Sequence, residues 1–196
     1  MITQMEHVIL GMIRIQLLGK KVPNHVLGAT GRGFEDLLED IGVPVNRKNG
    51  VDSVAFDWEF KTRQTGKTSS QTVGSMLPED VIAIMNWKDT PVYKKIRKQL
   101  RATISENGII TEIDLFDFDQ EFIQDIFEAD YKHARSQIVK DPGLIYTKYK
   151  KENYGYFENT DPKRTRSLDF RISNEKMDKL KAMAKSTFSQ LIEYDN

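Results

Sequence analysis

The chain has 196 residues, of which 39% are hydrophobic and 30% charged, so it can bury one substantial core. It contains no cysteine, which excludes disulfides, thiolate zinc sites and cysteine nucleophiles. Basic and acidic side chains are equal in number, so net charge alone indicates no polyanionic partner. No apolar run reaches the length of a membrane span, and we expect a cytoplasmic protein with no membrane partner.

Two helices are predicted near the start of the chain. Residues 4–18 have apolar side chains at helical spacing, and Arg14 and Gln16 interrupt the apolar run, which favours an amphipathic core helix over a signal peptide. Residues 33–42 predict a second, short helix that ends at Gly42, because glycine commonly follows the last turn of a helix. The residues expected on the core-facing side of the first helix are Val8, Ile9, Met12 and Ile15.

A strand is predicted over residues 50–63, after the turn dipeptide Asn49-Gly50. Because side chains of a strand point alternately to its two faces, one face would be aromatic and lie on the core. The other face would carry two carboxylates and a lysine. The aromatic set is Phe56, Trp58 and Phe60, and the charged set is Asp57, Glu59 and Lys61.

The remaining elements complete a single α/β or α+β domain over residues 1–196, with a central mixed sheet flanked by helices. No internal repeat and no long linker divides it. After the strand we expect a polar loop over 64–80, a buried strand over 81–87 and a helix over 90–100 that is capped by Thr90. A hairpin over 101–119 turns at Asn107-Gly108, and a helix over 119–139 follows it. The chain then forms a hairpin from 143–159 and 166–173 and closes with a helix over 173–194.

The charged face of the 50–63 strand needs a physical explanation, because carboxylates that converge near a core repel each other. A hard divalent cation removes this repulsion, and magnesium suits two carboxylates together with waters and a phosphate oxygen. Lys61, two residues after Glu59, could hold a water beside the metal or stabilise charge on a phosphate. The alternative is an exposed strand whose acidic and basic side chains form ordinary cross-strand pairs.

A longer pattern surrounds these residues. Leu37-Leu38-Glu39 ends the second predicted helix, Asp52 follows a turn, six residues separate it from Glu59-Phe60-Lys61-Thr62, and the basic segment VYKKIRKQL comes next. This order resembles the PD-(D/E)XK nucleases, in particular the MutH-type mismatch-repair nickases and related type II restriction endonucleases. The resemblance covers residues 30–100 by motif and the rest of the chain only by the order of elements.

The resemblance implies a role for each matched residue. Asp52 and Glu59 would be the metal ligands and Lys61 the catalytic lysine. Glu39 would orient a water or lie in the outer shell of the metal, and Lys95 would be an additional active-site lysine. Two rival assignments stay open, Lys94 in place of Lys95 and Asp57 in place of Asp52.

Basic residues are concentrated in the second half of the chain. Residues 131–185 hold fourteen lysines and arginines against seven acidic residues, whereas residues 105–130 hold nine acidic residues and no lysine or arginine. Such segregation is typical of a protein with one face for a polyanion, and two solvated helix faces of opposite sign would give the same pattern. Together with the resemblance, it implies that residues 140–190 contact DNA. The candidate DNA-binding residues are Arg63, Lys67, Lys148, Lys150, Lys151, Lys163, Arg164, Arg166 and Arg171.

Taken with the resemblance, the pattern predicts a restriction-endonuclease-like fold and a magnesium-dependent endodeoxyribonuclease that cleaves double-stranded DNA, with manganese as a substitute metal. The resemblance implies bacterial or phage origin, and a second copy of the chain or a repair or phage protein as a further partner. Two other functions stay open. One is a DNA-binding module without hydrolysis, and the other is a protein-interaction domain that uses the acidic 105–130 segment.

Overall fold

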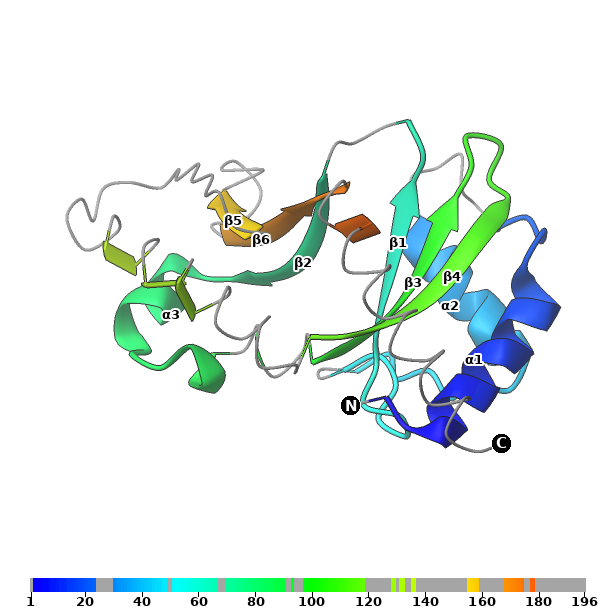
Figure 1. Ribbon diagram of the computed structural model, residues 1–196, viewed down its shortest axis with the longest axis horizontal. Helices are drawn as coiled ribbons and strands as arrows, with labels where there is room; N and C mark the ends of the chain where they lie inside the picture. The colour runs from blue at the N-terminus through cyan, green and yellow to red at the C-terminus, as the bar shows by residue number, and fades with distance from the viewer. Residues whose placement is uncertain are drawn as a thin grey trace, which may run out of the picture. The chain divides into compact units, whose positions relative to one another are not determined.

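The computed structural model groups the chain into two compact units (Figure 1). Unit 1 consists of Met1–Thr68 and Lys95–Gln120, and unit 2 consists of Ser69–Lys94 and Glu121–Asn196. No helix in the described part of the chain is long and apolar enough to cross a membrane. The structure describes residues 2–23, 30–48, 51–66, 70–90, 93, 97–118, 128–129, 131–132, 135–136, 155–158, 168–174 and 177–178.

Unit 1 is a mixed α/β structure built on a three-stranded sheet. The strands are β1 (Glu59–Gln64), β3 (Lys98–Ile104) and β4 (Ile110–Asp117), in the order β1-β3-β4. β1 runs parallel to β3, and β3 pairs with β4 in the predicted antiparallel hairpin. Gly108, at the turn of this hairpin, has φ +82°, a left-handed conformation that glycine adopts without strain.

Two helices cover one face of this sheet, which we call the core face (Figure 1). α1 (Gln4–Leu17) packs against β4 and α2 (Thr30–Asp40) packs against β1. Phe34 of α2 meets Phe60 of β1 edge to face, with ring centroids 6.5 Å apart. The strand residues buried on the core face are Phe60, Leu100, Ala102, Ile104, Ile113 and Leu115.

The first helix is confirmed at its predicted position, but the prediction of its buried face was wrong. Leu10, Ile13 and Leu17 lie in the core. Of the four residues expected there, only Ile9 packs partly against the core, and Val8, Met12 and Ile15 are exposed. The helix carries two apolar stripes, and sequence periodicity by itself does not say which one faces the sheet.

Two glycines in α2 have different surroundings and provide a matched test of packing. A Cβ atom on Gly33 would overlap the carbonyl oxygen of Pro23 and lie 2.7 Å from Cγ1 of Val22. A Cβ atom on Gly31 would meet only the Thr62 hydroxyl, at 3.9 Å.

Gly33→Ala is therefore expected to lower the free energy of unfolding by about 1–3 kcal/mol, the usual cost of overpacking. Gly31→Ala should be neutral or slightly stabilising, because alanine is the better helix former. Urea unfolding of the two variants measures both effects. Equal stabilities would show that the Pro23 backbone does not limit this part of α2.

Several predictions about the middle of the chain need correction. The strand expected over 50–63 begins only at Glu59, because residues 54–57 form a turn. The helix expected over 90–100 cannot extend to its predicted end, since Lys98, Gln99 and Leu100 belong to β3. The Thr90 hydroxyl does accept a hydrogen bond from the Tyr93 N–H, as an N-cap does.

Unit 2 contains a second sheet, in the order β2-β6-β5, with antiparallel pairing throughout. β2 (Ser70–Met76) lies where a loop was expected, whereas β5 (Gly155–Glu158) and β6 (Leu168–Ser173) confirm the predicted pairing of these segments. The strand expected over 81–87 is instead occupied by α3 (Pro78–Ala83) and a 3-10 turn, η2 (Trp87–Asp89).

The sequence did contain the signal for α3. Pro78 lies at the first position of this helix, and Glu79 and Asp80 lie in its first turn, where acidic side chains are favourable. The Tyr131 hydroxyl holds the end of the helix through the carbonyl oxygens of Val81 and Ile84. Most of the helices predicted over 119–139 and 173–194 lies outside the described residues.

Candidate functional site

The face of the unit 1 sheet opposite the helices is polar, and we call it the site face. Its residues follow from the strand registers, because residues that pair across neighbouring strands share a face. Glu59 pairs with Gln99, and Lys61 pairs with Arg101, which in turn pairs with Asp114. The site face consists of Glu59, Lys61 and Arg63 in β1, Gln99, Arg101 and Thr103 in β3, and Glu112, Asp114 and Phe116 in β4.

Asp52 lies beside Glu59 because a short hairpin connects them. Ser53 and Trp58 form an antiparallel bridge, with N–H···O distances of 2.8 and 3.1 Å, and both residues are buried. Continuing this register by one residue places Asp52 opposite Glu59. Asp52 Oδ2 also accepts a hydrogen bond from the N–H of Phe60, 2.6 Å away. The backbone of Asp52 therefore lies opposite that of Glu59 at the start of β1.

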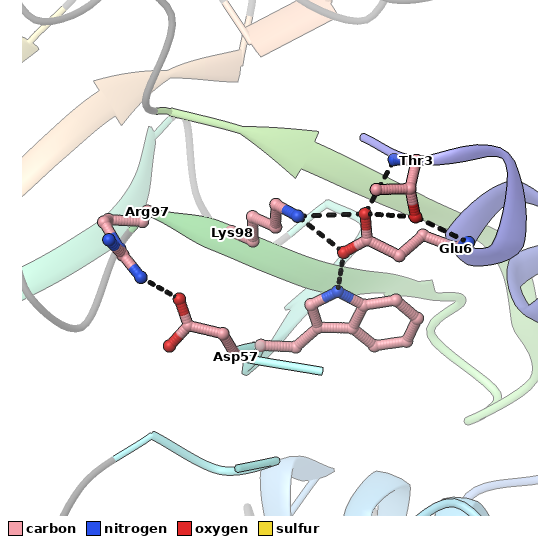
Figure 2. Close-up of polar contacts among 6 residues, drawn as sticks. Thr3, Glu6, Asp57, Arg97 and Lys98 are labelled. Carbon is pink, nitrogen blue, oxygen red and sulfur yellow. Dashed lines mark hydrogen bonds and ion pairs between the residues drawn. The ribbon is translucent and has the colours of Figure 1, made fainter. Parts of the chain in front are cut away.

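The hairpin that carries Asp52 and Glu59 is tied to the rest of unit 1 by two ionic contacts (Figure 2). Glu6, at the start of α1, accepts hydrogen bonds from Lys98 Nζ at 2.7 and 2.9 Å and from the Trp58 indole at 3.0 Å. Asp57, in the turn, forms an ion pair with Arg97. Both contacts connect the hairpin to the beginning of β3, so they hold the two site strands in place.

The Glu6 carboxylate remains charged although it is buried. Burial raises the pKa of Glu6, but the hydrogen bonds from Lys98, Thr3 and Trp58 outweigh burial and bring the pKa to about 2. Thr3 contributes its backbone N–H at 2.7 Å and its hydroxyl at 3.0 Å, as part of a capping box for α1. Glu6 is therefore an anchor of the hairpin, and it lies on the core side of the sheet with α1.

Glu59 and Lys61 interact directly on the site face. Glu59 Oε1 lies 2.5 Å from Lys61 Nζ, and the Glu59 side chain is 11% exposed, whereas that of Lys61 is 27% exposed. A charge-assisted hydrogen bond of this kind orients the ammonium group beside the carboxylate. Two predicted site residues, Glu59 and Lys61, are therefore in contact, and Asp52 lies on the neighbouring arm of the hairpin.

The sequence analysis missed Glu35 of α2. Burial and the neighbouring Asp52 carboxylate raise the pKa of Glu35, against the opposing charges of Arg47 and Arg32. Glu35 is thus a third carboxylate close enough to Asp52 to interact with it electrostatically. Helical spacing places both Glu35 and Glu39 next to the buried Phe34–Leu38 stripe, so the sequence offered two candidates for one role.

Glu39, the candidate chosen from the sequence, lies one turn further along α2. Its side chain is more than half exposed and contacts Arg47 at 2.8 Å. Arg47 also contacts Asp36 at 2.6 Å and Glu35 at 3.8 Å, so one guanidinium group contacts three carboxylates of α2 and offsets part of their charge. The role of Glu39 beside a metal stays a prediction.

The other predicted residues are distributed over both units or lie outside the described part. Asp57, the rival of Asp52, has φ +56° in the turn and does not share a strand face with Glu59. Arg63 lies at the far end of β1, on the site face. Arg171 lies in β6 of unit 2. The predicted residues outside the described part are Lys67, Lys94, Lys95, Lys148, Lys150, Lys151, Lys163, Arg164 and Arg166.

Asp52 and Glu59 are the residues that would hold a metal ion if one binds at this hairpin. Among the residues that the structure describes, no group of three or more histidine, aspartate or glutamate side chains is arranged to enclose a metal ion. Asp52 and Glu59 lie on the two arms of one hairpin, and magnesium usually keeps several waters and takes only one or two carboxylates from the protein. Oxygen donors of this type suit magnesium and manganese.

Comparison with known proteins assigns no family to the chain. No protein-family model matches it, and no curated protein is similar to it.

Proposed function

We propose that the chain is a magnesium-dependent endodeoxyribonuclease with a restriction-endonuclease-like fold, and that Asp52, Glu59 and Lys61 form its catalytic centre. One observation carries the proposal. A hairpin places Asp52 opposite Glu59, and Lys61 Nζ lies 2.5 Å from Glu59 on the same face of the sheet. Two carboxylates and an ammonium group in this arrangement fit hydrolysis of a phosphodiester.

Asp52 and Glu59 would hold the metal ion. When bound, the ion would supply Lewis-acid chemistry to the phosphate and offset the charge of the two carboxylates. Manganese has the same preference for oxygen donors and would replace it.

The protein groups have separate tasks in this proposal. The Lys61 ammonium, oriented by Glu59, donates hydrogen bonds to the attacking water or to a phosphate oxygen as negative charge develops. Glu35, whose pKa is raised, would accept or hold a proton of a water next to Asp52. Glu39 is the alternative for this task, at the exposed end of the same helix.

The mixed sheet with helices on its core face supports the proposed fold. The strand that carries Glu59 and Lys61 runs parallel to β3, so the two strands present their side chains to one face in matching order. Of the acidic residues in the 105–130 segment, Asp114 and Asp117 are buried in β4. These two carboxylates are therefore not part of an exposed acidic surface.

A plasmid assay tests the proposed function. Supercoiled DNA incubated with the protein and Mg²⁺ is expected to give nicked or linear products, and EDTA should abolish cleavage because the two carboxylates then lack their cation. Mn²⁺ should restore activity. DNA binding without cleavage in either metal would favour a binding module, and absence of DNA retention at low salt would favour a protein-interaction domain.

A further inference from the structure

One side of α1 packs on the sheet of unit 1, and the opposite side is also apolar (Figure 1). Four large apolar side chains on that opposite side have exposed fractions between 56% and 85%, and we call them the outer stripe. They are Met5, Val8, Met12 and Ile15. Leu18, which is 44% exposed, follows them at the end of the helix. A contiguous exposed apolar surface of this kind is typical of a protein interaction site.

The spacing of the outer stripe predicts the kind of partner. Its members are separated by three, four and three residues, which is the spacing of the core positions in a coiled coil. Side chains spaced in this way form one narrow row along the helix, into which a second helix can insert its own side chains. The surface therefore fits a helix.

The residues that flank the outer stripe carry no charge. When a helix selects a different chain as its partner, charged side chains at the flanking positions usually set the choice. The flanks of α1 offer no charge for such a choice, and two copies of α1 would bring no like charges together there. The flanking residues are Gln4, Ile9, Gly11 and Gln16. A second copy of the chain is therefore the partner that this surface fits.

The outer stripe is self-complementary when the two helices run in opposite directions. Met5 of each copy then lies opposite Ile15 of the other, and Val8 lies opposite Met12, because both pairs have the same midpoint along the helix. The opposed helix dipoles also attract each other. A parallel pair would instead place the exposed Lys20 of each copy beside the same residue of the other, where like charges repel. The antiparallel order is therefore the favourable one.

Gly11 supports the close approach of a second helix. Glycine is a poor helix former, so an interior glycine needs a physical reason. The packing of the chain itself provides none, because a Cβ atom on Gly11 would have no packing contact within 4 Å. Gly11 lies three residues after Val8 and four before Ile15, so it is next to the outer stripe. The absence of a side chain at this place lets the backbone of another helix come near.

We infer that the outer stripe of α1 is the docking surface for a second copy of this chain, and that the two helices pair in antiparallel order about a two-fold axis. Such an interface is isologous, so the same residues serve both copies. α1 has 14 residues and is about 21 Å long, so one helix pair buries less than a standard interface, which covers about 800 Å² per partner. The dimer is therefore expected to dissociate in the micromolar range. The inference does not depend on the proposed nuclease function.

Sedimentation equilibrium of the full chain from about 1 μM to about 200 μM measures the association. The wild type is expected to change from monomer to dimer over this range. Met12→Lys should raise the dissociation constant at least about 100-fold, because each copy then places an ammonium group in the apolar contact. Val54→Lys is the matched control. It changes an apolar residue of unit 1 that is 71% exposed but lies outside the outer stripe, so this variant should dimerise like the wild type.

Gly11→Gln separates a lost interface from a damaged helix. The space around Gly11 accepts a side chain, and glutamine is the better helix former, so the melting temperature of the monomer should rise. The same side chain should block the approach of the second helix and raise the dissociation constant at least about 10-fold. A Gly11→Gln variant that dimerises as tightly as the wild type would overturn the inference.

Cross-linking tests the direction of the helices. The chain has no cysteine, so a single introduced cysteine is its only thiol. Oxidation of a mixture of Met5→Cys and Ile15→Cys proteins is expected to give a disulfide-linked dimer that contains one chain of each variant, because these positions lie opposite each other in the antiparallel pair. Either variant alone should give much less dimer. A higher yield from each variant alone than from the mixture would refute the antiparallel order.

A wild type that stays monomeric at the highest concentration overturns the inference. That result would follow if another segment of this chain, or a helix of a different protein, occupies the outer stripe. A dimer that Met12→Lys leaves unchanged has its interface elsewhere and overturns the inference as well. These measurements contain neither DNA nor Mg²⁺, so a failure of the proposed nuclease function would not alter their outcome.

Discussion

Glu59→Gln is expected to lower the single-turnover rate of DNA cleavage by at least about 10³-fold while the variant stays folded and binds DNA. Glutamine keeps the size of the side chain and one acceptor oxygen, but it removes the charge that would hold the metal and that orients Lys61. Lys61→Ala should have a similar effect on the rate, because it removes the other member of the 2.5 Å contact. Single-turnover kinetics at saturating protein, with DNA retention measured in Ca²⁺, separate the loss of chemistry from a loss of binding.

Asp57→Asn is the matched control for Glu59→Gln. Asp57 lies only two residues earlier, yet its carboxylate contacts Arg97 and not the site face. Asparagine tolerates the positive φ of this position, so the turn should form as before. If Asp57→Asn loses activity and Asp52→Asn keeps it, Asp57 and not Asp52 is the partner of Glu59. Full cleavage by Glu59→Gln would refute the proposed centre.

Glu6→Gln is expected to lower the free energy of unfolding at pH 7 by about 3 kcal/mol, from the difference between the pKa of about 2 and the ordinary value of 4.5. The carboxylate accepts hydrogen bonds from Lys98, Trp58 and Thr3, and a glutamine can keep only part of this network. Breaking one side of a buried ion pair leaves Lys98 without its counter-charge. Urea unfolding monitored by tryptophan fluorescence measures the loss.

The effect of Glu6 should depend on pH in a defined direction. Because the pKa is lowered in the folded state, the stabilisation is complete above pH 4.5 and is lost as the pH falls from about 4.5 to about 2. The difference between wild type and Glu6→Gln should therefore shrink over this range.

The exposed ion pair in the same region is the control (Figure 2). Asp57 and Arg97 each have more than two fifths of their side chains exposed, so Asp57→Asn should change the unfolding free energy by less than about 1 kcal/mol. A stability of Glu6→Gln equal to that of Asp57→Asn would show that the buried network contributes nothing beyond a surface contact.

The pattern in residues 50–63 was interpreted correctly in its second half and wrongly in its first. From Trp58 onwards, aromatic and charged residues alternate between the core face and the site face, as a strand requires. Before Trp58 the same alternation continues in the sequence, but the chain turns, and Asp57 adopts a left-handed conformation. Alternation over a few residues does not reveal where a chain reverses, because a turn residue and a strand residue can be of the same type.

The choice between the two glutamates of α2 shows a similar limit of sequence patterns. Glu35 and Glu39 are one turn apart on α2, so they lie on the same side of the helix and the sequence does not distinguish them. Their difference arises from burial and from the position of Asp52, which raises the pKa of Glu35, whereas Glu39 contacts Arg47 near the end of the helix. Only the packing of α2 on β1 distinguishes them.

The sequence by itself determined the local features whose causes are local. These are the length of α1, the glycine turn at Gly108, the strand that carries Glu59 and Lys61, and the adjacency of these two side chains on one face. Only the tertiary structure decided which apolar stripe of α1 is buried, that Asp52 lies opposite Glu59, and that Arg101 stands beside Lys61. Those outcomes depend on hairpin geometry and strand register, which bring together residues that are distant in the chain. Such contacts produce no periodic pattern in the sequence.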